Sequence, residues 1–345
     1  MSLAARDGQL RANWYVACLS RELGARRPIA RTVYEQHLVL YRDASGKAVC
    51  LPDRCLHRNA PLAAGRIREG CLVCPYHGWT YDGAGNVTEI PSEGNAPRSH
   101  FRLLPVPTLE QDGCIWIWCG DGPPDPSAPP FRCPHADDRE WISYFMITDF
   151  ANEVTHLAEN FMDVPHTAFV HEGWFRRRTR ARVPIRVERG ATDVLVTYLH
   201  EADEIGFTGR LVNPRKEPVR HTDRFILPNL TRVDYHFGER RSFLICSQCT
   251  PVGEYRTRVY TQIAYRLPLG MLLEPFFRFY TRRVIEQDVA IMKLQGGNLQ
   301  RYEGAKFHHT AADVVHVSIE QLREAAARGE LRESAPQTIE KVIWT

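Results

Sequence analysis

The sequence predicts an α+β protein with a small N-terminal all-β domain and a larger C-terminal domain that combines strands with helices. Three observations carry this prediction: short apolar runs broken by turn residues in the first third, a Pro- and Gly-rich stretch at residues 120–130, and longer strand and helix patterns beyond it. A chain of 345 residues is long enough for about two domains. We place them at residues 1–120 and 121–345.

The first domain has the pattern of a meander of short strands. Four apolar runs are bounded by turn residues, as is typical of antiparallel strands: HLVLYRD, AVCLPD, LVCPYHGWTYD and GCIWIWCG. The stretch GDGPPDPSAPP, residues 120–130, follows them. Its prolines are incompatible with a helix interior or a central strand, so it is the expected domain boundary.

The second domain begins with a helical pattern from about Asn152 to Val170. Three long strand patterns come next: TDVLVTYLHEA, RSFLICSQCTPV and TRVYTQIAYRL. A helical pattern then runs from about Leu272 to Gln295.

Charge and composition exclude several classes of protein. Lys and Arg total 44 against 41 Asp and Glu, and this balance gives no footprint for nucleic-acid binding. The first residues, MSLAARDGQLRANWYV, lack a secretion signal, and no apolar run is long enough to span a membrane. The ten cysteines are therefore expected as reduced thiols in a cytoplasmic protein.

Two short motifs combine two cysteines with two histidines. Cys55 and His57 stand in CLHR, and Cys74 and His77 stand in CPYHGW. Thiolates and imidazoles in close pairs indicate a metal centre. Zinc sites generally pair like with like, whereas a Rieske [2Fe–2S] cluster needs two thiolates on one iron and two imidazoles on the other. The mixed pairs therefore favour a Rieske cluster over zinc.

A second polar series lies within the apolar segment AENFMDVPHTAFVHEGWF, which contains Asp163, His166 and His171. Two imidazoles and one carboxylate on one face of Fe(II) leave the other face open, an arrangement found in non-haem iron oxygenases. Core histidines that hydrogen-bond backbone carbonyls are the alternative interpretation of His166 and His171.

The third ligand is expected in YTRRVIEQDVAIMKLQ. Helical spacing places Asp288 within one face that also holds Val284, Ile285, Ile291, Met292 and Gln295. A buried carboxylate without a cation is unfavourable, and coordination of a metal offsets that cost. Glu286 falls on the other side of the helix, where we expect it in solvent.

Together these motifs resemble those of the Rieske-type non-haem iron oxygenases, also called ring-hydroxylating oxygenases. CLHR and CPYHGW are similar to the family's cluster motif, and Asp163, His166 and His171 match its Asp-x-x-His-x-x-x-x-His motif at each position. The resemblance covers residues 14–120 and the motifs beyond. It implies a β-rich Rieske domain followed by a catalytic domain, in which an antiparallel sheet curves around a C-terminal helix.

The resemblance also implies a role for each site residue. Cluster ligands would be Cys55, His57, Cys74 and His77, and mononuclear Fe(II) ligands would be His166, His171 and Asp288. Asp163 would hydrogen-bond both His166 and His77 of the partner subunit, joining the two centres across a subunit boundary in a ring-like homotrimer. An N-cap or a lone salt bridge is the alternative for Asp163. The family carries a polar group near Asn160.

The implied activity is that of a terminal oxygenase component. Such a component uses O₂ and electrons from a separate reductase, with or without a ferredoxin, to hydroxylate or oxidatively demethylate a hydrophobic ring compound. NAD(P)H takes part only through the reductase, because no G-x-G-x-x-G follows a strand in this chain. The compact chain favours monooxygenation over cis-dihydroxylation. An electron carrier without oxygenase activity and a zinc-stabilised binding module are the other hypotheses.

Three features have no firm role. His156 lies one helical turn before Asn160 and is expected beside the site. Cys246 and Cys249 form a C-x-x-C on a strand, where they face opposite sides and are expected as core thiols. The run FRRRTRAR, residues 175–182, predicts a solvated basic surface, or alternatively a docking patch for an acidic electron donor.

Overall fold

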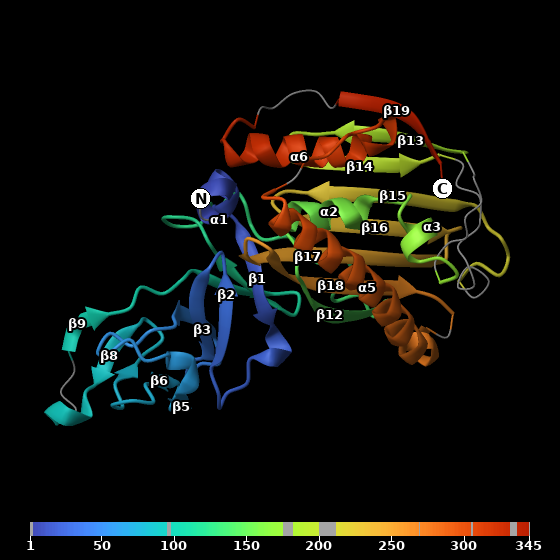
Figure 1. The fold of residues 1–345 in the computed structure, drawn as a ribbon. Helices are drawn as coiled ribbons and strands as arrows, with labels where there is room; N and C mark the ends of the chain where they lie inside the picture. The colour runs from blue at the N-terminus through green and yellow to red at the C-terminus, as the bar shows by residue number, and fades with distance from the viewer. Residues whose placement is uncertain are drawn as a thin grey trace. The chain divides into compact units, whose positions relative to one another are not determined.

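The computed structural model describes residues 3–94, 98–174, 182–199, 212–268, 270–304, 306–331 and 337–344. The chain forms two compact units (Figure 1). One comprises Leu3–Ala5 and Arg11–Arg132, and the other Arg6–Leu10 and the chain from Cys133 onward. The division falls just beyond the Pro- and Gly-rich stretch, while the assignment of functional domains to residues 1–120 and 121–345 stays a prediction.

Small antiparallel sheets build the described part of the first unit. The first sheet has the order β1 (Trp14–Leu19), β11 (Cys114–Trp118), β10 (Thr108–Gln111). The second has the order β2 (Ile29–Val33), β3 (Gln36–Arg42), β4 (Ala48–Pro52). The third has the order β5 (Arg66–Arg68), β6 (Cys71–Val73), β7 (Thr80–Tyr81), β8 (Asn86–Glu89), β9 (Arg98–Arg102).

The predicted strand LVCPYHGWTYD is in fact two short strands, β6 and β7, which flank a loop. This loop is anchored because Cys74 and Trp79 are buried in the same apolar core as Cys55 and Leu72. Short helical segments complete the first part of the chain: α1 (Leu3–Asp7), η1 (Gly8–Arg11), η2 (Ser20–Glu22), η3 (Leu62–Ala64) and η4 (Pro91–Glu93).

The second unit is built on an eight-stranded antiparallel sheet. Its order is β12 (Ile142–Phe150), β18 (Arg256–Arg266), β17 (Arg241–Gly253), β16 (Leu230–Phe237), β15 (Val219–Ile226), β14 (Asp193–Tyr198), β13 (Arg182–Arg189), β19 (Gln337–Trp344). The predicted fold class is therefore confirmed: a β-rich N-terminal unit precedes a unit with a large antiparallel sheet and C-terminal helices.

Helices cover one face of this sheet (Figure 1). They are α2 (Val154–Met162), α3 (Thr167–Val170), α5 (Gly270–Arg301) and α6 (Val314–Ala327), with the short turn η5 (Ala311–Asp313) before α6. Apolar side chains of α2 and α6 pack with those of β13, β14 and β15, and those of α5 pack with β12, β17 and β18. No helix within the described residues has the length and apolar character needed to cross a membrane.

The predicted helix from Asn152 to Val170 is interrupted. Residues 163–166 separate α2 from α3, because Pro165 has no N–H to donate and restricts the residue before it. The interruption places Asp163 at the end of α2 and His166 at the start of α3. It therefore shapes the site described next.

Candidate metal centres

The two Cys/His motifs form loops with the same backbone pattern. In the first loop the Cys55 N–H donates to the Ala60 carbonyl (2.9 Å) and the Asn59 N–H donates to the Cys55 carbonyl (2.9 Å). In the second the Cys74 N–H donates to Trp79 (2.8 Å) and the Gly78 N–H donates to Cys74 (3.2 Å). In each loop the cysteine N–H therefore donates to the carbonyl of the residue five positions further along the chain.

Each loop also turns on a residue with a left-handed backbone. Asn59 has φ 55° and Gly78 has φ 74°, and Asn and Gly adopt this conformation more readily than other residues. The matching turns present Cys55 and Cys74 at equivalent positions. The histidines differ by one position: counted from the cysteine, His57 is the third residue of its motif and His77 is the fourth of its own.

Thiols and imidazoles are grouped by type at this site. Cys55 and Cys74 are both buried, while the rings of His57 and His77 lie 4.5 Å apart between centroids. The Tyr81 hydroxyl lies 3.2 Å from Cys55 Sγ. Burial raises the pKa of the Cys74 thiol, so a thiolate here needs a metal cation beside it.

This donor set fits a two-iron cluster better than one zinc ion. His57 Nδ1 is buried and has no hydrogen-bond partner in the described chain, as expected of a ligand atom. The ligand atoms of Cys55, His57, Cys74 and His77 do not gather as closely as those of His166, His171 and Asp288, which lie within 4.8 Å of one another. A tetrahedral zinc ion would bring its four ligands within such a distance, whereas a Rieske cluster spreads them over two irons.

His166, His171 and Asp288 form a nearly equilateral triangle. The two Nε2 atoms lie 3.3 Å apart, and the Asp288 Oδ1 atom lies 3.4 Å from His166 Nε2 and 3.2 Å from His171 Nε2. Ligands about 2.1 Å from a metal and about 90° apart would be separated by about 3.0 Å. The three atoms therefore fit one face of a metal ion.

The other nitrogen of each imidazole faces an oxygen. His171 Nδ1 lies 2.9 Å from Gln287 Oε1, which fixes the proton on Nδ1 and leaves the Nε2 lone pair for a metal. His166 Nδ1 lies 3.7 Å from Asp163 Oδ2. Asp288 and Asp163 keep the pKa of His166 above its ordinary value although burial lowers it.

Asp288 is held as a carboxylate inside the protein. It is 6% exposed, and Asn160 Nδ2 donates to its Oδ1 at 3.2 Å. Burial alone would raise its pKa, but hydrogen bonds and charge from His166 and His171 lower it to about 2. The carboxylate is therefore ready to bind a cation.

Close packing at the end of α5 sets the position of Asp288. Asn152 Nδ2 donates to the Met292 carbonyl and to Gln295 Oε1, both at 2.9 Å. A Cβ at Gly296 would lie 2.2 Å from the Ala151 carbonyl oxygen, so only glycine allows this approach. These contacts fix α5 against the start of α2.

The predicted orientation of helix α5 is correct for Asp288, which is buried, and for Glu286, which is exposed, but wrong for Ile291. Glu286 is 53% exposed at its side chain and pairs with Arg283 (3.0 Å). Ile291, which was expected on the buried face, is 39% exposed, so the buried face of α5 is narrower here than the apolar stripe in the sequence. The binding of iron by Asp288 stays a prediction.

Asp163 lies between two cavities. It lines the cavity beside His166 and a second cavity that is also lined by His309 and His316. Its Oδ2 lies 4.0 Å from His316 Nε2. Burial raises the pKa of Asp163, while His316 and His166 oppose this effect.

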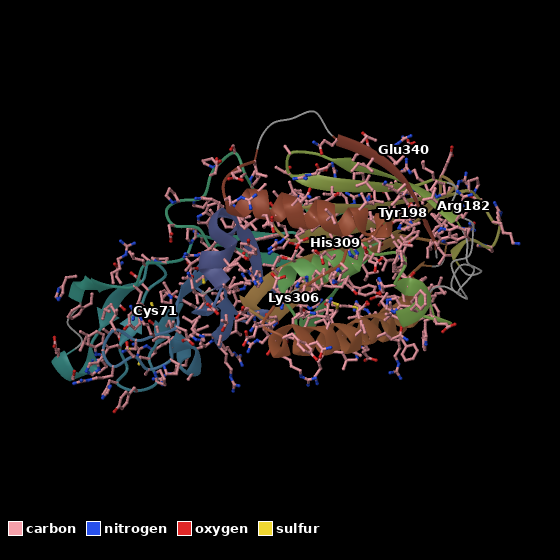
Figure 2. The ribbon with its side chains drawn as sticks, turned by 45° about the horizontal axis from the view of Figure 1, so that its top comes forward. Cys71, Arg182, Tyr198, Lys306, His309 and Glu340 are labelled. Carbon is pink, nitrogen blue, oxygen red and sulfur yellow. The ribbon has the colours of Figure 1, made fainter. Side chains whose placement is uncertain are left out.

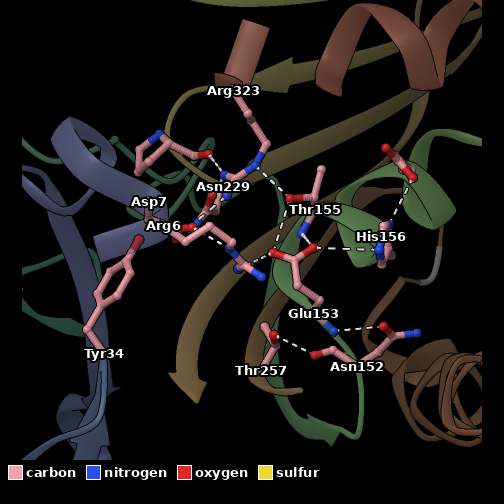
Figure 3. A network of polar contacts seen from close by, with 12 residues as sticks. Arg6, Asp7, Tyr34, Asn152, Glu153, Thr155, His156, Asn229, Thr257 and Arg323 are labelled. Atoms are coloured by element: carbon pink, nitrogen blue, oxygen red, sulfur yellow. Dashed lines mark hydrogen bonds and ion pairs between the residues drawn. The ribbon is translucent and has the colours of Figure 1, made fainter. Parts of the chain in front are cut away.

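His156 belongs to a different polar network (Figure 3). Its Nδ1 lies 3.4 Å from Glu159 Oε2 and its Nε2 lies 4.0 Å from Glu153 Oε2. Glu153 also accepts from Arg6 at 2.7 Å. This network ties the segment Arg6–Leu10 to α2. Among the described residues His156 contacts Glu153, Glu159 and Phe307 and not the metal-ligand triad.

The structure describes both cysteines of the C-x-x-C motif but only one residue of the basic run 175–182. Cys246 and Cys249 are both buried, 2% exposed each. Of the basic run 175–182, only Arg182 lies within the described residues, where its guanidinium is 5.8 Å from the ring of Trp344. The docking hypothesis for that run falls outside the described residues.

A cavity of about 140 Å³ opens beside the triad. Its size is close to that of a cavity that holds one benzene ring. Apolar side chains from the sheet and the helices form much of its wall, among them Phe150, Phe161, Val233, Ile245, Ile263 and Ile285. Phe225 and Phe237 are buried in apolar clusters.

Sequence reasoning missed three residues of this site: Gln287, His221 and Asp223. Gln287 contacts His171, and the other two line the cavity from β15. The spacing of His221 and Asp223, two residues apart in a strand, was a usable signal because such residues share a face.

Comparison with known families gives two matches. Residues 13–109 match the Rieske [2Fe–2S] domain, and residues 153–329 match the vanillate O-demethylase oxygenase C-terminal domain. The second match covers more than half of the chain.

Similar proteins include the oxygenase component of dicamba O-demethylase from Stenotrophomonas maltophilia, 37% identical over 47% of this chain and 48% of the relative. Another is the aminopyrrolnitrin oxygenase PrnD of Pseudomonas fluorescens, 34% identical over 47% of this chain and 46% of the relative. The chain spans about half or less of the length of the curated relatives it matches.

Solved structures share the fold. Dicamba monooxygenase bound to dicamba has a TM-score of 0.80 at 22% identity, covering 93% of this chain and 98% of the other. An NdmA mutant from Pseudomonas putida CBB5 with theobromine has a TM-score of 0.76 at 20% identity, covering 98% of each chain.

The first prediction concerns the cluster. Anaerobically purified protein should be red-brown and, after reduction with dithionite, should give a Rieske EPR signal. Cys55→Ser or His57→Ala should remove both, because each deletes one ligand. Cys71→Ser is the matched control, since Cys71 is a thiol next to the loop but outside both motifs. A signal that survives in either ligand variant would contradict the assignment.

The second prediction concerns the mononuclear site. His166→Ala, His171→Ala and Asp288→Ala should each keep the coloured cluster and lose the remaining iron, because two protein ligands hold Fe(II) too weakly. Glu286→Ala, on the same helix, should keep it. Metal analysis of the four variants decides: an empty site in Glu286→Ala together with a full one in Asp288→Ala would show that the ligand is wrong.

Proposed function

The chain belongs to the Rieske non-haem iron oxygenases, and on that premise we propose that it is the terminal component of an oxidative demethylase. Its substrate would be a small ring compound with a methyl group on oxygen or nitrogen. Electrons would come from a separate reductase, directly or through a ferredoxin. NAD(P)H would supply that reductase.

The observation that carries this proposal is the position of the triad. His166, His171 and Asp288 converge at one end of a cavity of about 140 Å³ whose wall is largely apolar. Three protein ligands on one face leave the opposite face of a metal open toward that cavity. A substrate and O₂ would therefore meet in a place that protein side chains shield from bulk water.

The reaction balances with one O₂, two electrons and two protons. One oxygen atom enters a C–H bond of the methyl group, and the other leaves as water. The hydroxymethyl product then releases formaldehyde and leaves a hydroxyl or an N–H on the ring compound. When bound, the Rieske cluster supplies single electrons and the mononuclear iron supplies O₂ activation.

The residues of this chain have distinct tasks in that reaction. Gln287 would orient His171 through Nδ1, and Asn160 would hold the Asp288 carboxylate through its Oδ1. Phe150 and Phe161 contact each other edge to face at 5.7 Å and would limit the access of water to the methyl group. Cys55, His57, Cys74 and His77 would hold the cluster.

Asp163 is proposed as the electron bridge. Its Oδ2 lies 3.7 Å from His166 Nδ1, which has no hydrogen-bond partner in the described chain, and Asp163 also lines the second cavity. A closer approach would let Asp163 accept from His166 on one side and from His77 of the partner subunit on the other. This role requires a closed assembly, and a homotrimer is our expectation. The homotrimer and the cytoplasmic location stay predictions.

Demethylation is preferred over other oxygenations because of the relatives. The C-terminal match is to the vanillate O-demethylase oxygenase, and a 37% identical relative is the oxygenase component of dicamba O-demethylase. An electron carrier that has lost its iron would not need a complete triad. Hydroxylation without loss of a methyl group and cis-dihydroxylation remain possible outcomes of product analysis.

The third prediction tests the reaction. With a surrogate reductase, NADH and O₂, candidate aryl methyl ethers and N-methyl compounds should yield formaldehyde and a product lighter by one CH₂. Mass spectrometry and a formaldehyde assay measure both. A product heavier by one oxygen without formaldehyde would mean hydroxylation, and one heavier by two oxygens and two hydrogens would mean cis-dihydroxylation.

The fourth prediction tests the bridge. Asp163→Asn should keep the cluster spectrum and the mononuclear iron, because Asn fills the same space, yet reduce turnover by roughly two orders of magnitude. Asn cannot accept with a full charge from two imidazole N–H groups. Stopped-flow oxidation of the reduced cluster is the measurement.

Asp313→Asn is the control for this variant. Asp313 lies 3.9 Å from His316, in the same cavity as Asp163, but does not contact His166. Its variant should oxidise the cluster at the wild-type rate. A wild-type rate in Asp163→Asn, or full activity of an isolated monomer, would rule out the proposed bridge.

A further inference from the structure

His221 and Asp223 form a buried polar pair on the cavity wall. Both lie on β15, on the sheet side of the cavity, and they are 0% and 2% exposed. His221 Nε2 donates to Asp223 Oδ1 at 2.7 Å, and the Tyr198 hydroxyl donates to Asp223 Oδ2 at 2.9 Å. Figure 2 labels Tyr198, which lies on the neighbouring strand β14.

The ring of His221 is fixed from both sides. It pairs across the sheet with Tyr198 on β14 and with Tyr235 on β16. Both tyrosine rings stack on it with centroids 4.1 Å away and planes within 8° and 17° of parallel. A side chain held by two stacks and one short hydrogen bond has a defined orientation, as a recognition group requires.

Stability alone does not account for this pair. Asp223 is flanked across the sheet by Val196 and Val233, so apolar residues suit this row. Replacing a buried ion pair with apolar residues of similar size is often neutral or stabilising, while removing one partner is strongly destabilising. A polar pair that lines a largely apolar cavity is better explained by a ligand that contacts it.

Thr231 belongs to a second polar strip of the same wall, away from His221. It lies on β16, is 1% exposed and lines the cavity. It pairs with Phe225, four residues along β15 from His221. Ser247 and Thr261 continue this row across β17 and β18, with their hydroxyl oxygens 3.3 Å apart.

We propose that His221, oriented by Asp223, determines the substrate class by hydrogen-bonding an uncharged oxygen substituent of the ring. This inference rests on the proposed function and names the substrate class for it: a methylated ring compound that also carries a hydroxyl or carbonyl group. The methyl group faces the triad while the oxygen faces β15. One end is then recognised and the other reacts.

Charge favours an uncharged oxygen over a carboxylate. His221 already bonds one carboxylate, Asp223, and a second one would have to share the same imidazole. Like charges so close together disfavour ionisation of both groups. Neither Lys nor Arg occurs among the described residues that line the cavity, so the described wall offers no other cation to a carboxylate.

The fifth prediction is tested by binding, without turnover. Equilibrium dialysis of the iron-loaded protein under anaerobic conditions, without reductase, uses three probes of similar size: 4-methoxyphenol, 4-methylanisole and 4-methoxybenzoate. Wild type should bind the phenol at least about tenfold more tightly than the methyl analogue, because the analogue leaves the polar wall unpaired. It should also bind the phenol more tightly than the benzoate.

Variants separate recognition from folding. His221→Phe should lower the preference for the phenol to about twofold or less, since it keeps the stack and removes the hydrogen bond. Asp223→Asn, which is isosteric, should lower it severalfold even if His221→Phe does not fold, because it weakens the hydrogen bond that orients His221. His236→Phe is the matched control, because His236 lies on the opposite face of β16 and should keep the full preference.

Three results would overturn the inference: a wild-type preference near one, an unchanged preference in both His221→Phe and Asp223→Asn, or tighter binding of the benzoate. Its failure is distinguishable from failure of the proposed function. Formaldehyde formation without the binding preference contradicts only the role of His221. The binding preference without formaldehyde contradicts only demethylation.

Discussion

The burial of the Asp288 carboxylate opposite two imidazoles is the interaction on which the catalytic unit depends. Removing a carboxylate from water is costly unless a cation or several donors replace the lost hydration. Here His166, His171 and Asn160 replace it, and they keep the carboxylate ionised. A divalent metal would take the place of the protons that the imidazoles hold, which couples metal binding to this part of the fold.

Several features of the unit follow from that requirement. Pro165 separates α2 from α3 so that His166 and His171 come from a short helix that can turn toward α5. Asn152 and Gly296 bring α5 close to the start of α2, which places Asp288 beside Asn160. The sheet supplies the remaining wall of the cavity, apolar beside Val233 and Ile245 and polar beside His221.

The sequence pointed to the residues that the structure gathers in the two candidate centres, and said less about their surroundings. The sequence was enough to find Cys55, His57, Cys74 and His77, because ligand type and spacing are local properties. It was enough to find Asp288, because a charged residue in an apolar helical stripe needs an explanation. Gln287 and the His221–Asp223 pair were not found, because their importance comes from contacts between distant strands and helices. Ile291 was misplaced because helix periodicity gives the direction of a face but not how far the neighbouring sheet extends over it. The break at Pro165 was visible in the sequence, yet its effect on His166 depends on tertiary packing.

The central claim is that one chain carries two different iron centres. Its most direct test is the amount of iron, zinc and acid-labile sulfide per chain in the anaerobically purified protein. A Rieske cluster with a mononuclear iron gives about three iron and two sulfide per chain, with no stoichiometric zinc. About two iron and two sulfide would contradict the mononuclear site and indicate an electron carrier. Zinc without sulfide would contradict both centres.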